Sequence, residues 1–247
     1  RIKIMAYSTI SKPSLYFNTK LYTGNGSTNA ITGVGFQPDW VWIKNRTGTN
    51  WHTLYDVIRG TTKVLNSNET GAESTDATGL TSFDSDGFTH GSGGNGNVNG
   101  GSFVSWNWKA NGAVSNNNNN DGQQYSTVSV NTTAGFSIVS YTGTGSNTNY
   151  GHGLGVAPKM IIVKNRSDSS GHWRVYHASQ GNTKYANLDD TAAFSASSAV
   201  WNNTTPTNSV FYVGSDNRAN GSGNAMIAYC FAEKKGYSKF GSYTGNG

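Results

Sequence analysis

Apolar residues along this chain gather in short runs of β-type side chains, separated by stretches rich in Gly, Asn, Ser and Thr. Residues 40–43 and 160–163 are continuous apolar runs bounded by Pro and Asn, which is typical of strands covered on both faces. Two stronger strand signals follow at residues 103–108 and 226–231. Few windows carry a period of 3.6 residues, and Gly, Asn or Thr interrupts nearly all of them. The pattern therefore predicts an all-β protein.

These runs come in two matching sets because the sequence repeats itself. A Tyr-Thr-Gly phrase begins at Tyr22, returns at Tyr141 and opens once more at Tyr243. Residues 33–46 and 153–166 match in their Gly and Pro positions and in a Lys-Asn-Arg ending. The spacing of about 100–120 residues is that of whole domains, well above the period of a solenoid repeat. We therefore expect two copies of one fold and the start of a third.

Large rings also recur at matching positions, which is more simply explained by a shared core than by a row of binding sites. The alternation of a strand places Val104, Trp106 and Trp108 on one face, matched by Ile227, Tyr229 and Phe231. The pairs that we expect to be equivalent are Trp51 with Trp173, Trp106 with Tyr229, and Trp108 with Phe231.

The repeat predicts two tandem antiparallel β-sandwich domains. The expected division is an N-terminal arm at 1–13, a first repeat at 14–112, an Asn-rich linker at 113–132, a second repeat at 133–235 and the start of a further repeat at 236–247. Two slender domains on such a linker would have little surface for rigid mutual docking. This expectation favours a homo-oligomer, and a trimer in particular, as the source of rigidity.

Composition narrows the function classes. Charged residues are only 13% of the chain, so the net charge of +5 reflects scarce acidic residues rather than a basic stripe, and we expect no nucleic-acid partner. No apolar run approaches the roughly 20 residues of a membrane span, and we expect no membrane partner. The single cysteine, Cys230, excludes an internal disulfide and lies in a strand-like run, where a buried, inert thiol is expected.

No catalytic or metal-binding motif stands out. Residues 84–87 resemble the opening of a calcium loop but lack its later ligands, and we interpret them as a turn. The five His residues fall at no metal-ligand spacing. A glycosidase would need a facing pair of acids, and the candidates, which we expect to be surface turn residues, are Asp39, Asp56, Glu69, Glu73 and Asp84. The expectation is a protein that is not an enzyme, with no catalytic residue, no metal and no cofactor.

Exposed aromatic rings would give the chain a way to contact sugars, because ring faces stack on pyranose rings. Trp201 has no clear counterpart in the first repeat and lies in a polar loop, while Tyr150 and His152 lie in a turn. These three residues are the candidate glycan contacts.

Several phrases together resemble a tandem-repeat family of virion proteins from marine tailed bacteriophages, described as tail-fibre-like or structural. They are the Tyr-Thr-Gly-Asn-Gly phrase from Tyr22, residues 35–46, residues 153–166 and residues 227–233. The resemblance covers nearly the whole chain from Met5 and implies a virion location and sandwiches similar to jelly-roll or lectin domains. It brings no active-site motif.

The resulting hypothesis is a non-enzymatic bacteriophage virion structural protein, either a head or tail fibre or a capsid decoration protein. Its expected partners are other virion proteins of the capsid or tail, further copies of itself and host surface glycans. Weak contacts with such glycans would gain strength from many copies. The alternative is a carbohydrate-binding module array of a glycan-degrading enzyme.

Overall fold

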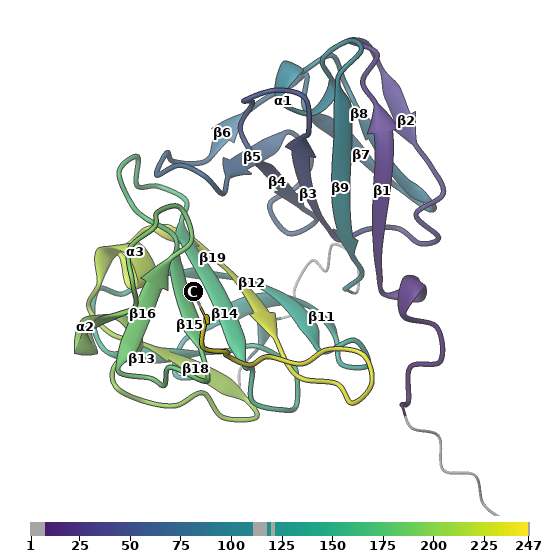
Figure 1. Cartoon of the computed structure of the whole chain (residues 1–247). Coiled ribbons are helices and arrows are strands. Elements are labelled where there is room, and N and C mark those ends of the chain that lie inside the picture. Colours follow the sequence, from purple (N-terminus) through teal and green to yellow (C-terminus); the bar gives the residue numbers. More distant parts are fainter. Residues whose placement is uncertain (1–7, 111–117, 120–121, 247) are drawn as a thin grey trace, which may run out of the picture.

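The computed structural model describes residues 8–110, 118–119 and 122–246 (Figure 1). Their regular structure is predominantly antiparallel β-sheet, which confirms the all-β prediction. The described helical segments are single turns: η1 (Pro13–Leu15), α1 (Gly94–Asn97), α2 (Ser198–Trp201) and α3 (Asn217–Asn220).

The first repeat forms one large and one small sheet. The large sheet has six strands in the order β1 (Phe17–Thr23), β9 (Ser102–Trp108), β3 (Trp40–Asn45), β4 (Thr53–Asp56), β5 (Lys63–Asn66) and β6 (Ser74–Thr75). The small sheet has the order β2 (Asn29–Ile31), β8 (Gly87–His90) and β7 (Leu80–Asp84). The β7–β8 connection is a tight turn at residues 85–86, as the sequence predicted in place of a calcium loop.

The second repeat follows the same strand order and adds two strands at one edge. Its large sheet runs β10 (Asn118–Asn119), β11 (Ser126–Asn131), β12 (Phe136–Thr142), β19 (Ala225–Phe231), β14 (Met160–Asn165), β15 (Arg174–His177), β16 (Lys184–Asn187) and β17 (Ser195–Ala196). Its small sheet pairs β13 (Thr148–Gly151) with β18 (Val210–Val213).

Strand register tests which residues of the two repeats are equivalent. Trp42 lies opposite Trp106 in the first repeat, and Ile162 lies opposite Tyr229 at the same place in the second. Trp106 and Tyr229 are therefore equivalent, as predicted. Their environments differ, since Trp106 is half-buried and Tyr229 is completely buried.

The predicted equivalence of Trp51 and Trp173 is wrong. Tyr55 and Tyr176 occupy matching positions, because each lies opposite the second residue of β3 or β14. Trp51 precedes its tyrosine by one residue more than Trp173 does. A one-residue offset along an extended chain sends a side chain to the opposite face. Trp173 is accordingly buried, whereas Trp51 is 50% exposed.

The segment at 113–132, predicted to be a linker, is partly sheet. Residues 113–117 and 120–121 lie outside the described residues, but β11 occupies 126–131 and pairs along its whole length with β12. Val128 is buried in the core of the second repeat, and Val130 packs against that core. The alternation of Val with polar residues at 126–131 is the strand signal that the interpretation as a linker overlooked.

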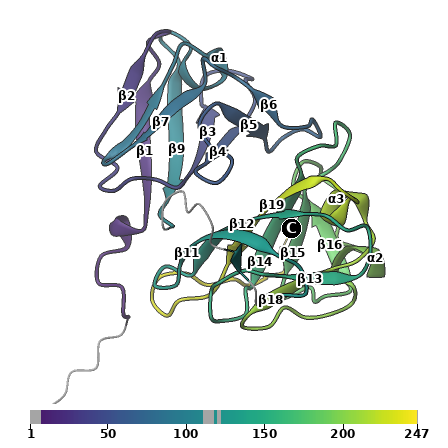
Figure 2. The same ribbon diagram turned by 180° about the vertical axis from the view of Figure 1, so that it is seen from behind.

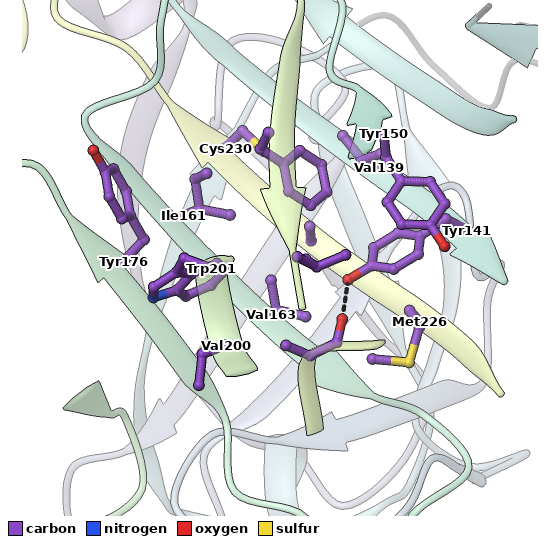
Figure 3. Close-up of a cluster of buried hydrophobic side chains, with 14 of the residues drawn as sticks. Val139, Tyr141, Tyr150, Ile161, Val163, Tyr176, Val200, Trp201, Met226 and Cys230 are labelled. Carbon is purple, nitrogen blue, oxygen red and sulfur yellow. Dashed lines mark hydrogen bonds between the residues drawn. The ribbon is translucent and has the colours of Figure 1, made fainter. Parts of the chain in front are cut away.

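Three hydrophobic clusters organise the chain. One lies in the first repeat, between β3, β4 and β9 of the large sheet and the small sheet, and includes Ile43, Leu80 and Phe88. A second occupies the corresponding position in the second repeat, where Tyr141 and Trp201 belong to it (Figure 3). The third, here called the inter-repeat cluster, joins the two repeats. Its buried members are Trp40, Leu54, Val57, Leu65, Ala110, Phe136, Ile138, Ile162, Trp173, Ile227, Tyr229 and Phe231.

The inter-repeat cluster overturns the expectation that the repeats have little surface for rigid docking. The Trp40 ring stacks on the Tyr229 ring, with centroids 4.3 Å apart and an interplanar angle of 17°. Figures 1 and 2 show the two repeats closely apposed, with loops of the second reaching toward β5 and β6 of the first. At these loops the Glu73 backbone N–H donates to the Arg166 carbonyl at 2.9 Å. The faces that bear the strongest aromatic pattern thus bury each other.

The segments before β1 and after β19 are described only in part. Residues 1–7 of the predicted arm lie outside the described residues, and the rest leads into η1. Beyond β19, the C-terminal segment returns to the inter-repeat cluster, where the Phe240 ring lies 6.3 Å from the Phe231 ring. That this segment begins a further repeat stays a prediction.

Candidate functional site: the junction of the two repeats

A buried ion-pair network crosses the junction beside the aromatic stack. Asp56, at the end of β4, accepts a hydrogen bond from the Tyr229 hydroxyl at 2.7 Å and one from Arg59 Nε at 2.5 Å. Arg59 also donates to the carbonyls of Lys63 and Leu54 at 3.0 and 2.9 Å. With both charged side chains fully buried, these bonds replace the water that each ion has lost.

A second ionic contact closes the outer rim of the same network. Glu73 pairs with Arg59 at 3.2 Å and with Arg166 of the second repeat at 2.7 Å. Burial by itself would lower the pKa of Arg59, but the carboxylates of Asp56 and Glu73 reverse this effect and raise it. Glu73 therefore links the two repeats through two arginines.

Lys164 of β14 supports the junction from the second repeat. Its buried ammonium group donates to the Thr70 carbonyl of the first repeat at 2.7 Å and to the Gly171 carbonyl. It also lies 5.9 Å from the centroid of the Trp173 ring, whose Nε1 donates to the Asn66 carbonyl at 3.0 Å. Burial lowers the pKa of Lys164 to about 8, although the negative charges of nearby acids act to raise it.

Next to this network, an open crevice of about 310 Å³ lies between the two repeats; it is called the polar crevice here because most of its wall residues are polar, although apolar atoms make up most of its exposed lining. Its walls are Trp42, His52, Ser67 and Asn68 from the first repeat and Leu188, Asp189, Asp190 and Thr191 from the second. Asp189 holds the second-repeat wall in place, because its carboxylate accepts from the Trp173 backbone N–H at 3.0 Å and pairs with His172 Nδ1 at 2.8 Å. The crevice thus combines one indole with hydroxyl, amide, imidazole and carboxylate groups.

The crevice carries the carboxylates of Asp189 and Asp190, which lie 2.8 and 3.7 Å from His172 Nδ1. Hydrogen bonds from the Asn187 side chain and the Ala192 backbone lower the pKa of Asp190, so its carboxylate is ionised at neutral pH. Burial and the charge of Lys44 lower the pKa of His52, so this imidazole is neutral there. The Asn68 side chain accepts from the His52 backbone N–H at 2.8 Å and fixes the geometry of that wall.

A second cavity at the junction is almost entirely apolar. It measures about 300 Å³ and opens beside the inter-repeat cluster. Its ring-bearing walls are Phe17, Trp40, Trp42, Trp108, Phe136, Phe231, Tyr237 and Phe240. The centroids of the Trp40 and Trp108 rings lie 4.3 Å apart along this wall.

Trp51 forms a separate surface site on the first repeat. A shallow hollow of about 250 Å³ brings its half-exposed ring together with Thr49, Asn50 and Asn95. The Asn50 side chain donates to the Gly94 carbonyl at 3.3 Å and ties the loop to α1. The expectation that Trp51 is a core residue hid this surface.

The three predicted glycan contacts are all buried, so their expected exposure is wrong. Trp201 ends α2 and packs edge-on against Tyr176, with ring centroids 5.9 Å apart (Figure 3). The Tyr150 hydroxyl donates to the Thr142 carbonyl at 2.7 Å. His152 accepts from the Leu154 backbone N–H at 3.1 Å. Polar neighbours in the sequence suggested exposure, but small-sheet and loop packing directs these side chains inward, where no sugar ring reaches them.

Three of the five acidic candidates, Asp39, Asp56 and Glu73, differ from the expectation of surface turn residues. Asp39 and Asp56 are buried. Asp39 accepts from the Ala110 backbone N–H at 2.6 Å, and Asp56 and Glu73 both bind Arg59. These acids are structural partners of cations and amides. The lone cysteine behaves as predicted: Cys230 is buried, and burial raises the pKa of its thiol to about 12.

In residues 8–110, 118–119 and 122–246, no group of three or more His, Cys, Asp or Glu residues is placed to hold a metal ion. Within the same ranges, no helix has the length and apolar character to cross a membrane.

The fold and the junction define an all-β protein whose two repeats meet through a shared aromatic core and a polar crevice. The chain belongs to a family described as a domain of unknown function (DUF7483), whose model matches residues 12–247. The match spans both repeats and the C-terminal segment. No curated protein and no solved structure gives a significant match to the chain.

Proposed function

We propose that this chain is a non-enzymatic structural protein of a bacteriophage virion, serving as a head or tail fibre or as a capsid decoration protein. The observation that carries the proposal is the fusion of two sequence-related repeats into one unit by the inter-repeat cluster. A folded unit that buries Trp40, Tyr229 and Trp173 at its internal joint transmits force without hinging there. A unit that does not hinge at its internal joint is suited to be a structural component of a virus particle.

The finer fold proposed is two tandem antiparallel β-sandwich domains of the jelly-roll or lectin-like kind. In support, each repeat has a large sheet facing a small sheet, with a hydrophobic cluster between them. Antiparallel sheets packed face to face in this way are the usual architecture of such sandwiches.

The non-enzymatic part of the proposal rests on how the acidic residues are used. Asp56 and Glu73 neutralise Arg59, and Asp39 caps a backbone amide. A glycosidase would need two such carboxylates facing open space across a cleft. The proposed partners remain other virion proteins of the capsid or tail, further copies of the chain as a trimer, and host surface glycans, with neither nucleic acid nor membrane.

Imaging of intact particles tests the proposal. Antibodies raised against the folded chain and carrying gold should label intact particles of the phage that encodes it at regular sites on the head or tail. Particles lacking the gene serve as the control. Absence of label from purified particles, with the protein found only in the unassembled lysate fraction, would contradict the virion assignment.

The alternative, a carbohydrate-binding module array of a glycan-degrading enzyme, is favoured by one observation, the crevice with an indole wall and unused polar groups. Covalent linkage to a catalytic domain in the mature protein, shown by mass spectrometry of the native gene product, would favour this alternative. Particle association would favour the virion protein.

A further inference from the structure

We infer that the polar crevice between the repeats binds one unit of an uncharged saccharide. The inference rests on the proposed role at the host surface and names the ligand class and the site. Residues of both repeats build the crevice, so it exists only in the docked pair. A volume of about 310 Å³ lies at the lower end of the usual range for small-molecule sites and is sufficient for one hexose ring.

The chemistry of the walls matches a sugar ring. A pyranose has an apolar C–H face, which stacks on an aromatic ring, and a rim of hydroxyl groups that donate and accept hydrogen bonds. Trp42 supplies the indole, which packs edge-on against Trp106 with ring centroids 6.2 Å apart. Asp190 supplies an acceptor, and the Asn68 amide group supplies donors.

Hydrogen-bonding capacity remains available around the indole. Among the described residues, none bonds to the His52 imidazole or to the Thr191 hydroxyl, and the Asn68 Nδ2 group is likewise unused. A neutral imidazole both donates and accepts, as hydroxyl groups do. Two such groups on the first-repeat wall and one on the second favour a polyhydroxylated ligand over an apolar one.

Charge sets the class of saccharide. The second-repeat wall carries the carboxylates of Asp189 and Asp190, with His172 Nδ1 at 2.8 and 3.7 Å from them, and His52 in the facing wall is neutral. A uronic or sialic acid would bring its carboxylate against these acids, and like charges at such range disfavour binding. The site therefore selects uncharged sugars, and its affinity should depend little on ionic strength.

Thr191→Arg and Thr49→Arg form a matched pair of blocking variants. Both threonines are exposed, and neither side chain bonds to a described residue. Arginine at residue 191 fills the crevice and can pair with Asp190, whereas arginine at residue 49 obstructs the Trp51 surface instead. Circular dichroism and thermal unfolding confirm that both variants fold.

The experiment uses the full chain on an array of neutral tetrasaccharides (cello-, malto-, manno- and chitotetraose) with tetragalacturonate as the acidic comparison. Titration calorimetry then quantifies the best ligand. We expect binding to at least one neutral probe, at least tenfold weaker for Thr191→Arg and less than twofold changed for Thr49→Arg. Binding to none of the neutral probes, preference for tetragalacturonate, or loss with Thr49→Arg alone would overturn the inference.

These outcomes are separate from those of particle imaging. Labelled particles with no saccharide binding would overturn the saccharide site and leave the virion assignment intact. Saccharide binding through the crevice by a protein that is absent from particles would support the saccharide site and overturn the virion assignment.

Discussion

Removing one hydroxyl at the junction measures how firmly the repeats are joined. Tyr229→Phe keeps the ring that stacks on Trp40 and deletes only the O–H group that donates to Asp56 at 2.7 Å. Both side chains are completely buried, so no water replaces the lost donor at the Asp56 carboxylate without a structural change.

The expected loss follows from the charge of the acceptor. A hydrogen bond to an ionised group contributes about 1.5–3 kcal/mol to stability, compared with about 0.5–1.5 kcal/mol for a neutral pair. Asp56 retains its bond from Arg59, which limits the penalty. We therefore expect Tyr229→Phe to lower the free energy of unfolding by about 2 kcal/mol.

Tyr141→Phe is the matched control. The Tyr141 hydroxyl is also buried, and it donates to a neutral acceptor, the Ala219 carbonyl, at 2.6 Å within the second repeat (Figure 3). Its loss should lower the free energy of unfolding by about 1 kcal/mol. Urea unfolding of the full chain, followed by tryptophan fluorescence and circular dichroism, gives both values.

Two results would refute the reasoning. If Tyr229→Phe lowered the free energy of unfolding by no more than Tyr141→Phe does, the hydrogen bond to Asp56 would not be a charge-assisted link across the junction. If the wild-type repeats unfolded in two separate transitions, the inter-repeat cluster would not couple them. We expect one transition, because unfolding either repeat exposes the aromatic face of the other.

Three further predictions follow from burial. Trp201→Ala should lower the free energy of unfolding by about 3–5 kcal/mol, and Trp51→Ala by less than about 1 kcal/mol. Chemical denaturation measures both losses, and equal losses would contradict the assigned burial. Because the folded state lowers the pKa of Lys164 to about 8, the unfolded chain binds more protons between pH 8 and about 10.4. The free energy of unfolding of wild type relative to Lys164→Met should therefore rise by about 2–3 kcal/mol across that window, and a fall would refute the sign. Finally, the Cys230 thiol should react with a disulfide reagent only in denaturant, and rapid reaction of the native protein would show that the thiol is accessible.

Local sequence patterns were sufficient to predict two central strands in each large sheet. Apolar runs at 40–43 and 160–163 lie in β3 and β14, and the segments at 103–108 and 226–231 lie in β9 and β19. These predictions succeeded because strand periodicity is a property of neighbouring residues. β11 carries the same kind of signal at 126–131, which the Asn-rich surroundings obscured.

Assignments of core and surface failed where a residue's environment comes from distant parts of the chain. Trp201 is surrounded in sequence by polar residues, yet it packs against Tyr176 from β15. Trp51 lies among similar neighbours and remains half-exposed. No local pattern distinguishes these two tryptophans, because the packing partner of one lies outside its own loop.

The sequence by itself determined the all-β class, the repeat and the equivalence of Trp106 with Tyr229, since each depends on periodicity or on comparison of two segments. Only the tertiary structure decided that the aromatic faces of the two repeats bury each other, with Asp56 bonding to Tyr229 across 173 positions of the chain. The crevice with Trp42 and Asp190 was likewise invisible in the sequence, because docking of the two repeats creates it. Docking depends on the shape and complementarity of whole surfaces, which strand periodicity does not encode.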